Sequence, residues 1–211
     1  MGTVEELREA IINGDRTAAK NSVEQALKEG SDASKLLSGV LIPAMTEVGD
    51  RFERQEFFVP EMLVAARAMQ EALAVLKPRL QAADVKPAGK LVLATVKGDL
   101  HDIGKNLVAI MMEGAGLEVV DLGVDAAPDS VVAAVKEHKP DLVGLSALLT
   151  TTMPMMKEVI EALKQAGIRD SVKVIVGGAP LTEEYAKSIG ADLYAADAAS
   201  AARVAVKALG N

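Results

Sequence analysis

From Lys90 onward, short runs of β-branched and other apolar residues alternate with longer stretches of helical periodicity. The apolar runs lie at residues 91–96, 118–122, 141–146, 172–177 and 191–196. Each run is followed by a predicted helix, at about residues 102–115, 128–138, 154–166, 182–188 and 198–209. Strands of mostly apolar character that are separated by helices form parallel sheets covered on both faces. The alternation therefore predicts a doubly wound α/β domain with a five-stranded parallel sheet, of the flavodoxin or Rossmann-like type.

The first 76 residues instead show apolar residues three and four positions apart throughout, which is typical of amphipathic helices. The predicted helix starts are Thr3, Asp15, Ser31 or Asp32, and Pro60. Pro43 lies inside the third pattern and should kink or divide that helix. The fourth helix is expected to run from Pro60 toward Pro78. Four such helices with short connections predict a small four-helix bundle.

A segment of different composition separates these two parts. Residues 77–89 (KPRLQAADVKPAG) hold two prolines, a glycine and otherwise mostly small or charged residues. We therefore expect a helical domain at residues 1–83, a linker at 84–89 and the α/β domain at 90–211.

The composition excludes several classes of protein. The 211 residues carry a formal charge of −7, which argues against a nucleic-acid partner. Cysteine is absent, so disulfides, thiolate zinc sites, iron–sulfur clusters and thiol nucleophiles are excluded. No apolar run approaches the roughly 18 residues of a membrane span, and the polar start MGTVEELREA does not resemble a signal peptide. We expect a cytoplasmic protein with no membrane partner.

The residues that follow the predicted strands are unusual in their chemistry. In a doubly wound sheet, ligands bind outside the carboxyl ends of the strands, so these residues should meet at one edge. They are the segment 97–104, the segment from Ser146 to Thr152, the segment 177–180 and the segment 196–198. Small and hydroxyl side chains there let a ligand approach the backbone closely. The sequence thus predicts a ligand site at this edge.

His101 is the strongest candidate for metal chemistry. A neutral imidazole coordinates through one ring nitrogen while the other donates to a carboxylate or carbonyl, and Asp99 lies two residues earlier. Gly104 would let a flat group lie against the start of the next helix. The alternative is that Asp99 only caps that helix and that His101 is a surface residue of its first turn. The second histidine, His138, suits a structural place at a helix C-terminus.

A longer pattern surrounds His101. Asp99-x-His101-x-x-Gly104 is followed by 41 residues, then Ser146-x-Leu148, then 28 residues, then Gly177-Gly178. In order and spacing this resembles the cobalamin-binding domain of corrinoid-dependent methyltransferases and mutases. The resemblance implies that His101 is the lower axial ligand to cobalt and that Asp99 bonds its other nitrogen. It further implies that the cofactor contacts Asp102, Ile103 and Gly104, and that its nucleotide tail passes Ser146, Leu148, Thr150, Gly177 and Gly178 toward Tyr194, Ala196 and Asp197.

The segment 48–61 carries a second resemblance. It looks like the helical cap of small methyl-carrying corrinoid proteins, which act on methanol, methylamines, aryl methyl ethers and betaines, and is similar to the cap of cobalamin-dependent methionine synthase. The resemblance implies that Phe52, Phe57, Phe58 and Val59 face the upper, methyl-bearing side of the corrin. The alternative is that the phenylalanines belong to the bundle core, and we expect at least one of them there. Because the chain has no tryptophan, a Phe/Trp lid cannot be complete.

Taken together, the resemblances imply a corrinoid methyl carrier rather than a complete catalyst. Its expected cofactor is cobalamin, in the methylcobalamin form during transfer. Its expected partners are a substrate-specific methyltransferase, a second methyltransferase that uses tetrahydrofolate or coenzyme M as acceptor, and a reductive activator protein. Three alternatives stay open: a subunit of an adenosylcobalamin-dependent mutase, a cobalamin-dependent sensor, and a metal-free flavodoxin-like or receiver domain.

Overall fold

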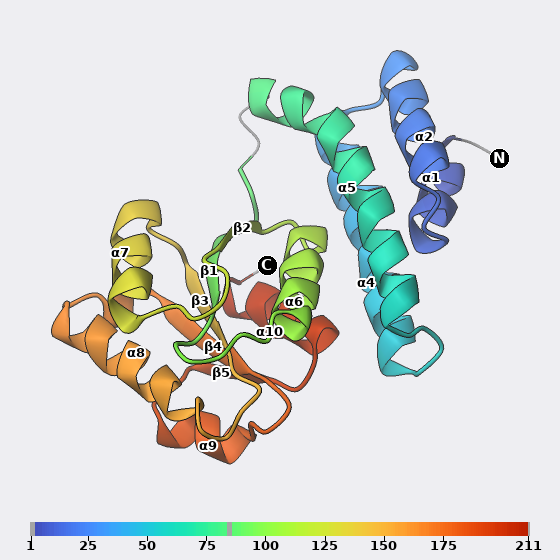
Figure 1. Ribbon diagram of the computed structural model, residues 1–211. Helices are drawn as coiled ribbons and strands as arrows, with labels where there is room; N and C mark the ends of the chain where they lie inside the picture. The colour runs from blue at the N-terminus through green and yellow to red at the C-terminus, as the bar shows by residue number, and fades with distance from the viewer. Residues whose placement is uncertain (1–2, 84–85, 211) are drawn as a thin grey trace. The chain divides into compact units, whose positions relative to one another are not determined.

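The computed structural model describes residues 3–83 and 86–210 (Figure 1). The chain divides between Lys86 and Pro87 into a helical unit and an α/β unit, each compact in itself. Within the described residues, no helix combines the length and the apolar character that crossing a membrane requires. Of the expected linker 84–89, residues 84 and 85 lie outside the described part of the chain.

The helical unit is built as the periodicity predicts. Its elements are α1 (Thr3–Ile12), α2 (Arg16–Lys28), α3 (Ala33–Leu36), the π-helical segment η1 (Leu37–Leu41), α4 (Ile42–Glu53) and α5 (Val59–Ala82). Asp15 and Asp32 cap α2 and α3 by accepting from the backbone amides of Ala18 and Lys35, each at 2.9 Å. The core is formed by buried aliphatic and methionine side chains, among them Leu7, Ile11, Leu41, Met45, Met62, Met69 and Leu76. With α3, η1 and α4 counted as one continuous helix, the predicted four-helix bundle is confirmed.

Two prolines act differently from one another. Pro43 is the second residue of α4 and lies just after η1. The amide of Ile42 bonds the carbonyl of Leu37, five residues back, so a wide turn interrupts the regular winding of the third helix near Pro43. Pro78, by contrast, lies inside α5, which continues to Ala82. The expectation that the helix ends at Pro78 is therefore wrong. Pro78 removes only one backbone bond near the helix end, and Ala74, whose carbonyl loses that bond, is exposed and accessible to water.

The α/β unit contains five parallel strands in the order β2-β1-β3-β4-β5. The strands are β1 (Lys90–Thr95), β2 (Glu118–Asp121), β3 (Leu142–Ser146), β4 (Lys173–Gly177) and β5 (Leu193–Ala195). The helices are α6 (Ile103–Gly114), α7 (Pro128–His138), α8 (Pro154–Gln165), α9 (Glu183–Ser188) and α10 (Ala198–Ala208), with a short 3-10 turn η2 (Arg169–Ser171) before β4. This confirms the predicted doubly wound domain.

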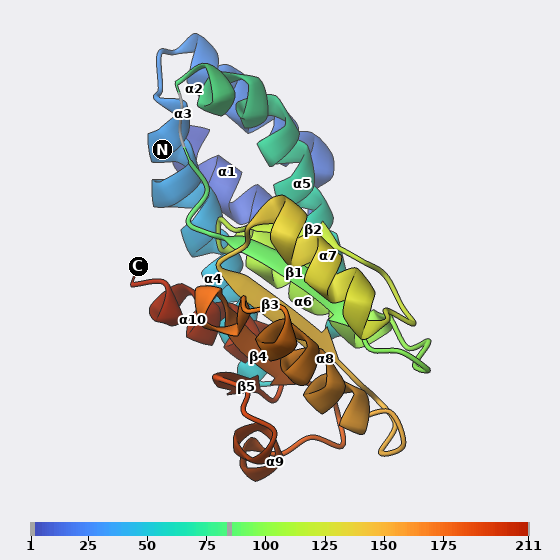
Figure 2. The same ribbon diagram turned by 90° about the vertical axis from the view of Figure 1, so that its left-hand side faces the viewer.

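Helices cover both faces of the sheet. Figures 1 and 2 show α6 and α10 on one face and α7 and α8 on the other. Buried side chains of the central strands, such as Val143 and Val174, pack with Val159 and Ile160 of α8 in one continuous core. The strand order changes direction between β1 and β3, because β1 leads outward to β2 whereas β3 leads outward to β4 and β5. Ligands in such sheets bind at this switch point, beyond the carboxyl ends of the strands.

Candidate functional site

The register of the sheet brings parts of the sequence pattern into one row. Thr95 pairs with Ser146, Ser146 with Gly177, and Gly177 with Ala195, so four neighbouring strands end side by side. The candidates of the α/β domain lie at these strand ends, in the loops that follow them or in the first turn of α6. The expected convergence at one edge of the sheet is therefore present, with its centre at the β1/β3 switch point.

Asp99, in the loop between β1 and α6, is buried completely and accepts hydrogen bonds with both oxygens. Its Oδ1 accepts from the backbone amide of His101 at 3.1 Å and from Nδ1 of the same residue at 2.7 Å. Its Oδ2 accepts from the amides of Leu148 and Leu149, at 2.8 and 3.3 Å. The hydroxyl of Thr152 donates to the same oxygen at 2.7 Å. The carboxylate thus joins the loop after β1 to the loop after β3, and among its described bonds none caps α6.

The electrostatics of Asp99 follow from these bonds. Burial by itself raises the pKa of the carboxyl group, because it disfavours the charged form. The donors from Thr152, Leu148 and His101 outweigh this effect and hold the pKa of Asp99 well below its usual range. Asp99 is therefore an anion whenever the protein is folded near neutral pH.

His101 is held at two places. Its Nδ1 lies against the Asp99 carboxylate, which fixes Nδ1 as the protonated nitrogen, and its carbonyl accepts from the Thr95 hydroxyl at 2.9 Å. Half of its side chain is nevertheless exposed, and no hydrogen bond involves Nε2 among the described residues. In the neutral imidazole, Nε2 then carries the lone pair, and the ring is held in a fixed orientation. No three His, Asp or Glu side chains of residues 3–83 and 86–210 gather into a metal site.

An apolar surface accompanies this imidazole. Leu100 and Ile103 are each 72% exposed, and Leu148 and Leu149 are each 42% exposed. Leu100, Leu148 and Leu149 belong to the two loops that Asp99 joins, and Ile103 is the first residue of α6. Gly104 adds to this surface an open position, because a Cβ built on it would meet nothing within 4 Å. Exposed apolar side chains gathered in this way mark a binding site for an apolar ligand or partner.

Gly177, the last residue of β4, and Gly178, which follows it, are required for packing at the same edge. A Cβ on Gly178 would lie 1.9 Å from the carbonyl oxygen of Ala147, and its φ of +138° is itself unfavourable for other residues. A Cβ on Gly177 would lie 2.9 Å from the carbonyl oxygen of Ala195. The glycine pair therefore lets β4 approach the ends of β3 and β5, and it ties the three parts of the sequence pattern to one place.

The remaining candidates of the α/β domain lie at this edge but differ in exposure and in whether their polar groups are already hydrogen-bonded. Leu148, Thr150 and Ala196 are exposed, whereas Ser146 is half-buried at the end of β3. The Tyr194 hydroxyl donates to the carbonyl of Leu181 at 3.1 Å. Asp197 caps α10 by accepting from the amide of Ser200 at 2.7 Å, so its carboxylate is already engaged. Asp102, just before α6, accepts from Asn106 at 3.2 Å.

Sequence reasoning missed Thr95 and Asp125, and it placed Thr152 in a predicted edge segment without giving it a role. Thr95 and Thr152 hold His101 and Asp99, and their signal is a hydroxyl at a strand end and in the loop after the third strand. Asp125, in the loop after β2, accepts from the amide of Gly98 at 2.7 Å and donates its own amide to the carbonyl of Asp99 at 3.0 Å. That loop carried no motif, although an aspartate with a φ of +54° is an unusual feature.

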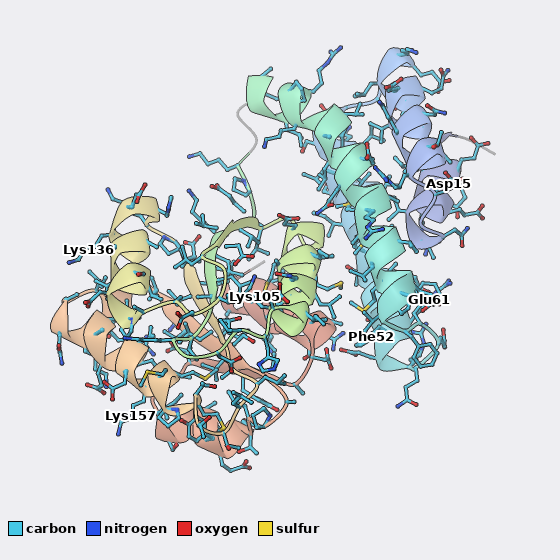
Figure 3. All side chains as sticks on the ribbon, in the orientation of Figure 1. Asp15, Phe52, Glu61, Lys105, Lys136 and Lys157 are labelled. Atoms are coloured by element: carbon cyan, nitrogen blue, oxygen red, sulfur yellow. The ribbon has the colours of Figure 1, made fainter. Side chains whose placement is uncertain are left out.

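The four candidates of the helical unit lie where α4 meets α5, near Phe52 and Glu61 in Figure 3. None of Phe52, Phe57 and Phe58 is buried, and Phe58 is 62% exposed. The expectation that at least one of them belongs to the bundle core is therefore wrong, because the core is already filled by aliphatic and methionine side chains. Phe57 instead packs beneath the guanidinium of Arg51, 5.2 Å from the ring centre. Val59 is half-buried at the start of α5.

Comparison with known proteins agrees with this geometry. A protein-family model described as a B12 binding domain matches residues 89–206. A second family model, also described as a B12 binding domain, matches residues 3–77. A corrinoid protein of Desulfitobacterium hafniense is 40% identical over 214 residues, which cover 100% of this chain and 99% of the relative. The trimethylamine corrinoid protein of Methanosarcina barkeri is 42% identical, over 97% of this chain and 94% of that protein.

A solved structure extends the comparison. In the methanol:cobalamin methyltransferase complex of Methanosarcina barkeri, one chain matches this structure with a TM-score of 0.87 and 29% identity, over 99% of this chain and 80% of that one. These matches favour the methyl-carrier interpretation over the mutase, sensor and receiver alternatives. The chain therefore belongs to the corrinoid proteins of methyltransferase systems, with a helical B12-binding unit followed by a Rossmann-like B12 binding domain.

Proposed function

We propose that this protein carries methyl groups between two methyltransferases on a bound corrinoid, with Nε2 of His101 as the lower axial ligand to cobalt. The observation that carries the proposal is the pair of Asp99 and His101, in which a buried carboxylate accepts from Nδ1 of a half-exposed imidazole and leaves Nε2 for a ligand. When bound, the cofactor supplies a cobalt centre that accepts a methyl group and gives it up again.

The residues fit such a group in chemistry and in space. An imidazole that donates through one nitrogen to a carboxylate is a stronger ligand through the other. The apolar side chains of Leu100, Ile103, Leu148 and Leu149 suit the face of a macrocycle, and the open position at Gly104 admits a flat group. We expect Asp102 and Ile103 to contact the ring edge as well.

For the nucleotide tail we propose a path along the row of strand ends. It would pass Ser146, Leu148 and Thr150, then Gly177 and Gly178, and end near Tyr194, Ala196 and Asp197. The glycine pair supports this path, because it removes side chains where the backbones of β3, β4 and β5 approach one another.

The helical unit is proposed to shield the upper side of the cofactor, with Phe52, Phe57, Phe58 and Val59 as its contact surface. The exposure of the aromatic rings supports this role, because large apolar side chains outside a core are available to a ligand. Such a cover blocks access by partner enzymes, so the unit must move during transfer. We place the domain boundaries at residues 83 and 90, as the sequence predicts.

The proposed partners are a donor-specific methyltransferase, an acceptor methyltransferase that uses tetrahydrofolate or coenzyme M, and a reductive activator protein. Relatives named for trimethylamine and dimethylamine, and the methanol complex, support a small methylated donor. We expect donor and acceptor specificity to be properties of the partner enzymes.

Axial ligation tests the proposal directly. The protein is labelled with ¹⁵N-histidine, loaded with cobalamin and reduced to cobalt(II), whose unpaired electron couples to its axial nitrogen. We expect an electron paramagnetic resonance pattern that changes on ¹⁵N labelling and is lost in His101→Ala but kept in His138→Gln. An electron paramagnetic resonance pattern that is the same with and without the ¹⁵N label overturns the assignment of His101.

Methyl transfer is tested in a second experiment. Cobalt(I) protein is mixed with a methyltransferase and one donor at a time, from methanol, methylamines, aryl methyl ethers and betaines, and methyl-cobalt formation is followed by absorbance. We expect formation with at least one enzyme and donor pair. Absence with every pair, in protein that shows His101 ligation, contradicts the carrier function.

A further inference from the structure

Lys105, in the first turn of α6, is a buried cation that the proposed site does not use. Lys105 is labelled in Figure 3, and only 2% of its side chain is exposed. Its Nζ donates to the Asp121 carboxylate at the end of β2 and to the Asn106 side-chain oxygen, the latter at 2.7 Å. Asp121 itself is 37% exposed. Lys105 is thus the largest fully buried side chain that carries a charge, four residues after His101.

The ion pair is connected to His101 by a path that does not include Asp99. The second oxygen of Asp121 accepts from the amide of Gly123 at 2.8 Å. The carbonyl of Gly123 accepts from the amide of Thr95 at 2.9 Å, and the hydroxyl of Thr95 donates to the carbonyl of His101 at 2.9 Å. The segment that carries His101 is therefore held on the β3 side by Asp99 and on the β2 side by Lys105.

Stability alone does not account for a buried cation whose partner carboxylate is 37% exposed. Removing the ammonium group from water is expensive, and an apolar side chain of similar volume often serves as well or better. A cation held at a fixed point does, however, allow only one arrangement of α6 against β2, whereas an apolar contact tolerates sliding. The position of the pair, between the start of α6 and the turn after β2, is where such sliding would move His101.

We infer that Lys105 and Asp121 position the imidazole of His101, by fixing α6 and the turn at Gly123 relative to β1. Both are positioning residues, since neither touches the exposed nitrogen of the ring. Their effect on cobalt ligation rests on the proposed function, whereas their effect on the orientation of the His101 ring can be measured in the protein without cofactor. The two effects can therefore be measured separately.

The cofactor-free protein gives the first readout. With only two histidines in the chain, ¹⁵N nuclear magnetic resonance of the neutral imidazoles separates His101 from His138 by comparison with His101→Ala. The structure predicts that His101 is mainly the Nδ1–H tautomer. In Lys105→Met and in Asp121→Asn, we expect the ratio of Nδ1–H to Nε2–H to fall about threefold to tenfold, which corresponds to weakening one hydrogen bond.

A matched control separates positioning from general loss of stability. Arg169 and Asp192 form a second ion pair, in which the Arg169 side chain is 14% exposed. Arg169 lies just before β4 and Asp192 just before β5, on the far side of the sheet order from β2. Arg169→Met should destabilise the fold without changing the His101 tautomer ratio. The double variant Lys105→Met/Asp121→Asn should show no larger change than either single variant, because both act through the same pair. If Lys105→Met does not fold, the isosteric Asp121→Asn carries the test.

The second readout is the cobalt(II) spectrum of the loaded protein. We expect the equilibrium constant for His101 ligation to fall at least about tenfold in Lys105→Met, as for other groups that orient a ligand, and to be unchanged in Arg169→Met. Tautomer ratios within twofold of wild type in both Lys105→Met and Asp121→Asn overturn the inference and leave the proposed function intact. A changed ratio in a protein whose cobalt shows no His101 nitrogen supports the positioning role and overturns the proposed function instead.

Discussion

The hydroxyl of Thr152 donates to the buried carboxylate of Asp99 across 2.7 Å, although the two residues are 53 positions apart in the chain. This bond, with those from the Leu148 and Leu149 amides, fastens the loop after β3 to the loop that carries His101. Because β1 and β3 flank the switch point of the sheet, the bond lies at the place where the fold itself directs a ligand.

Replacing Thr152 by valine should test the importance of this hydroxyl. The change keeps the shape of the side chain but leaves Oδ2 of a buried anion with one donor fewer. We expect the free energy of unfolding to fall by about 1–3 kcal/mol, measured by urea denaturation of the cofactor-free protein. Thr152→Ser keeps the hydroxyl and is the control; an equal loss in both variants would show that packing of the methyl group, and not the hydrogen bond, is responsible.

The pH dependence of stability should report the ionisation of Asp99. Hydrogen bonds hold its pKa in the folded protein below the unfolded value of about 4. The stabilisation from a lowered carboxyl pKa is complete above the unfolded pKa and is lost as the pH falls through the folded one. We expect the stability advantage of wild type over Asp99→Asn to shrink from pH 5 toward pH 2, by at least about 1.4 kcal/mol, the equivalent of one pKa unit.

The control for this titration is a pair of variants without the imidazole. His101→Ala and His101→Ala/Asp99→Asn differ only in the carboxyl group, and all other acidic groups cancel in the comparison. An advantage that stays constant down to pH 2 would contradict a lowered pKa for Asp99.

Gly104→Ala should separate folding from cofactor binding. A Cβ at this position has no neighbour within 4 Å, and alanine favours a helix more than glycine does. We therefore expect the stability of the cofactor-free protein to be unchanged or to rise by up to about 1 kcal/mol, while the dissociation constant of cobalamin increases. Fluorescence or absorbance titration with cobalamin measures the second effect; undiminished affinity would remove Gly104 from the site.

Gly178→Ala should, in contrast to Gly104→Ala, destabilise the fold. The added methyl group would meet the Ala147 carbonyl oxygen at 1.9 Å, so the backbone of β3 or β4 has to move. We expect a loss of stability of more than about 2 kcal/mol, because backbone strain and overpacking act together. The thermal unfolding midpoint of the cofactor-free protein measures it, and a midpoint equal to that of wild type would contradict the close approach of the two strands.

Phe58→Ala tests the proposed cover. Since Phe58 is 62% exposed, its removal should change the free energy of unfolding by less than about 0.5 kcal/mol. If the aromatic rings shield the cofactor, bound cobalt(I) should be oxidised faster by dissolved oxygen, as measured by absorbance. Val4→Ala, at another exposed apolar position of the bundle, should leave that rate unchanged; equal rates in all three proteins would exclude shielding by Phe58.

Much of the fold could be predicted because hydrophobic periodicity marks helices and strands directly. The five strands, the caps at Asp15 and Asp32, and the turn before Pro43 all follow from local pattern. The prediction failed at Pro78, where exposure lets a helix tolerate the missing bond, and at the phenylalanines, where residue type suggested a core that other side chains fill.

The site was predictable to the extent that its residues follow one another in the chain. Asp99 and His101 are two positions apart, and the spacing to Ser146 and Gly177 marks the other strand ends. Their supports were not predictable, because Thr95, Thr152 and Asp121 reach them through register and loop geometry that a single sequence does not encode locally. Lys105 illustrates the point, since a lysine in a first helical turn normally indicates solvent exposure.

The wide turn of η1 has a consequence for how the third helix keeps its buried face. Leu36, Val40, Ala44 and Val48 are all buried and follow one another at intervals of four. In a regular α-helix, a step of four residues overshoots a full revolution by about 40°, so such a row would spiral away from the core. The looser winding at Leu37–Leu41 offsets part of that drift. The wide turn thus accommodates one extra residue, and deleting Gly39 should convert it to regular α-helix while Ala44 and Val48 keep facing the core.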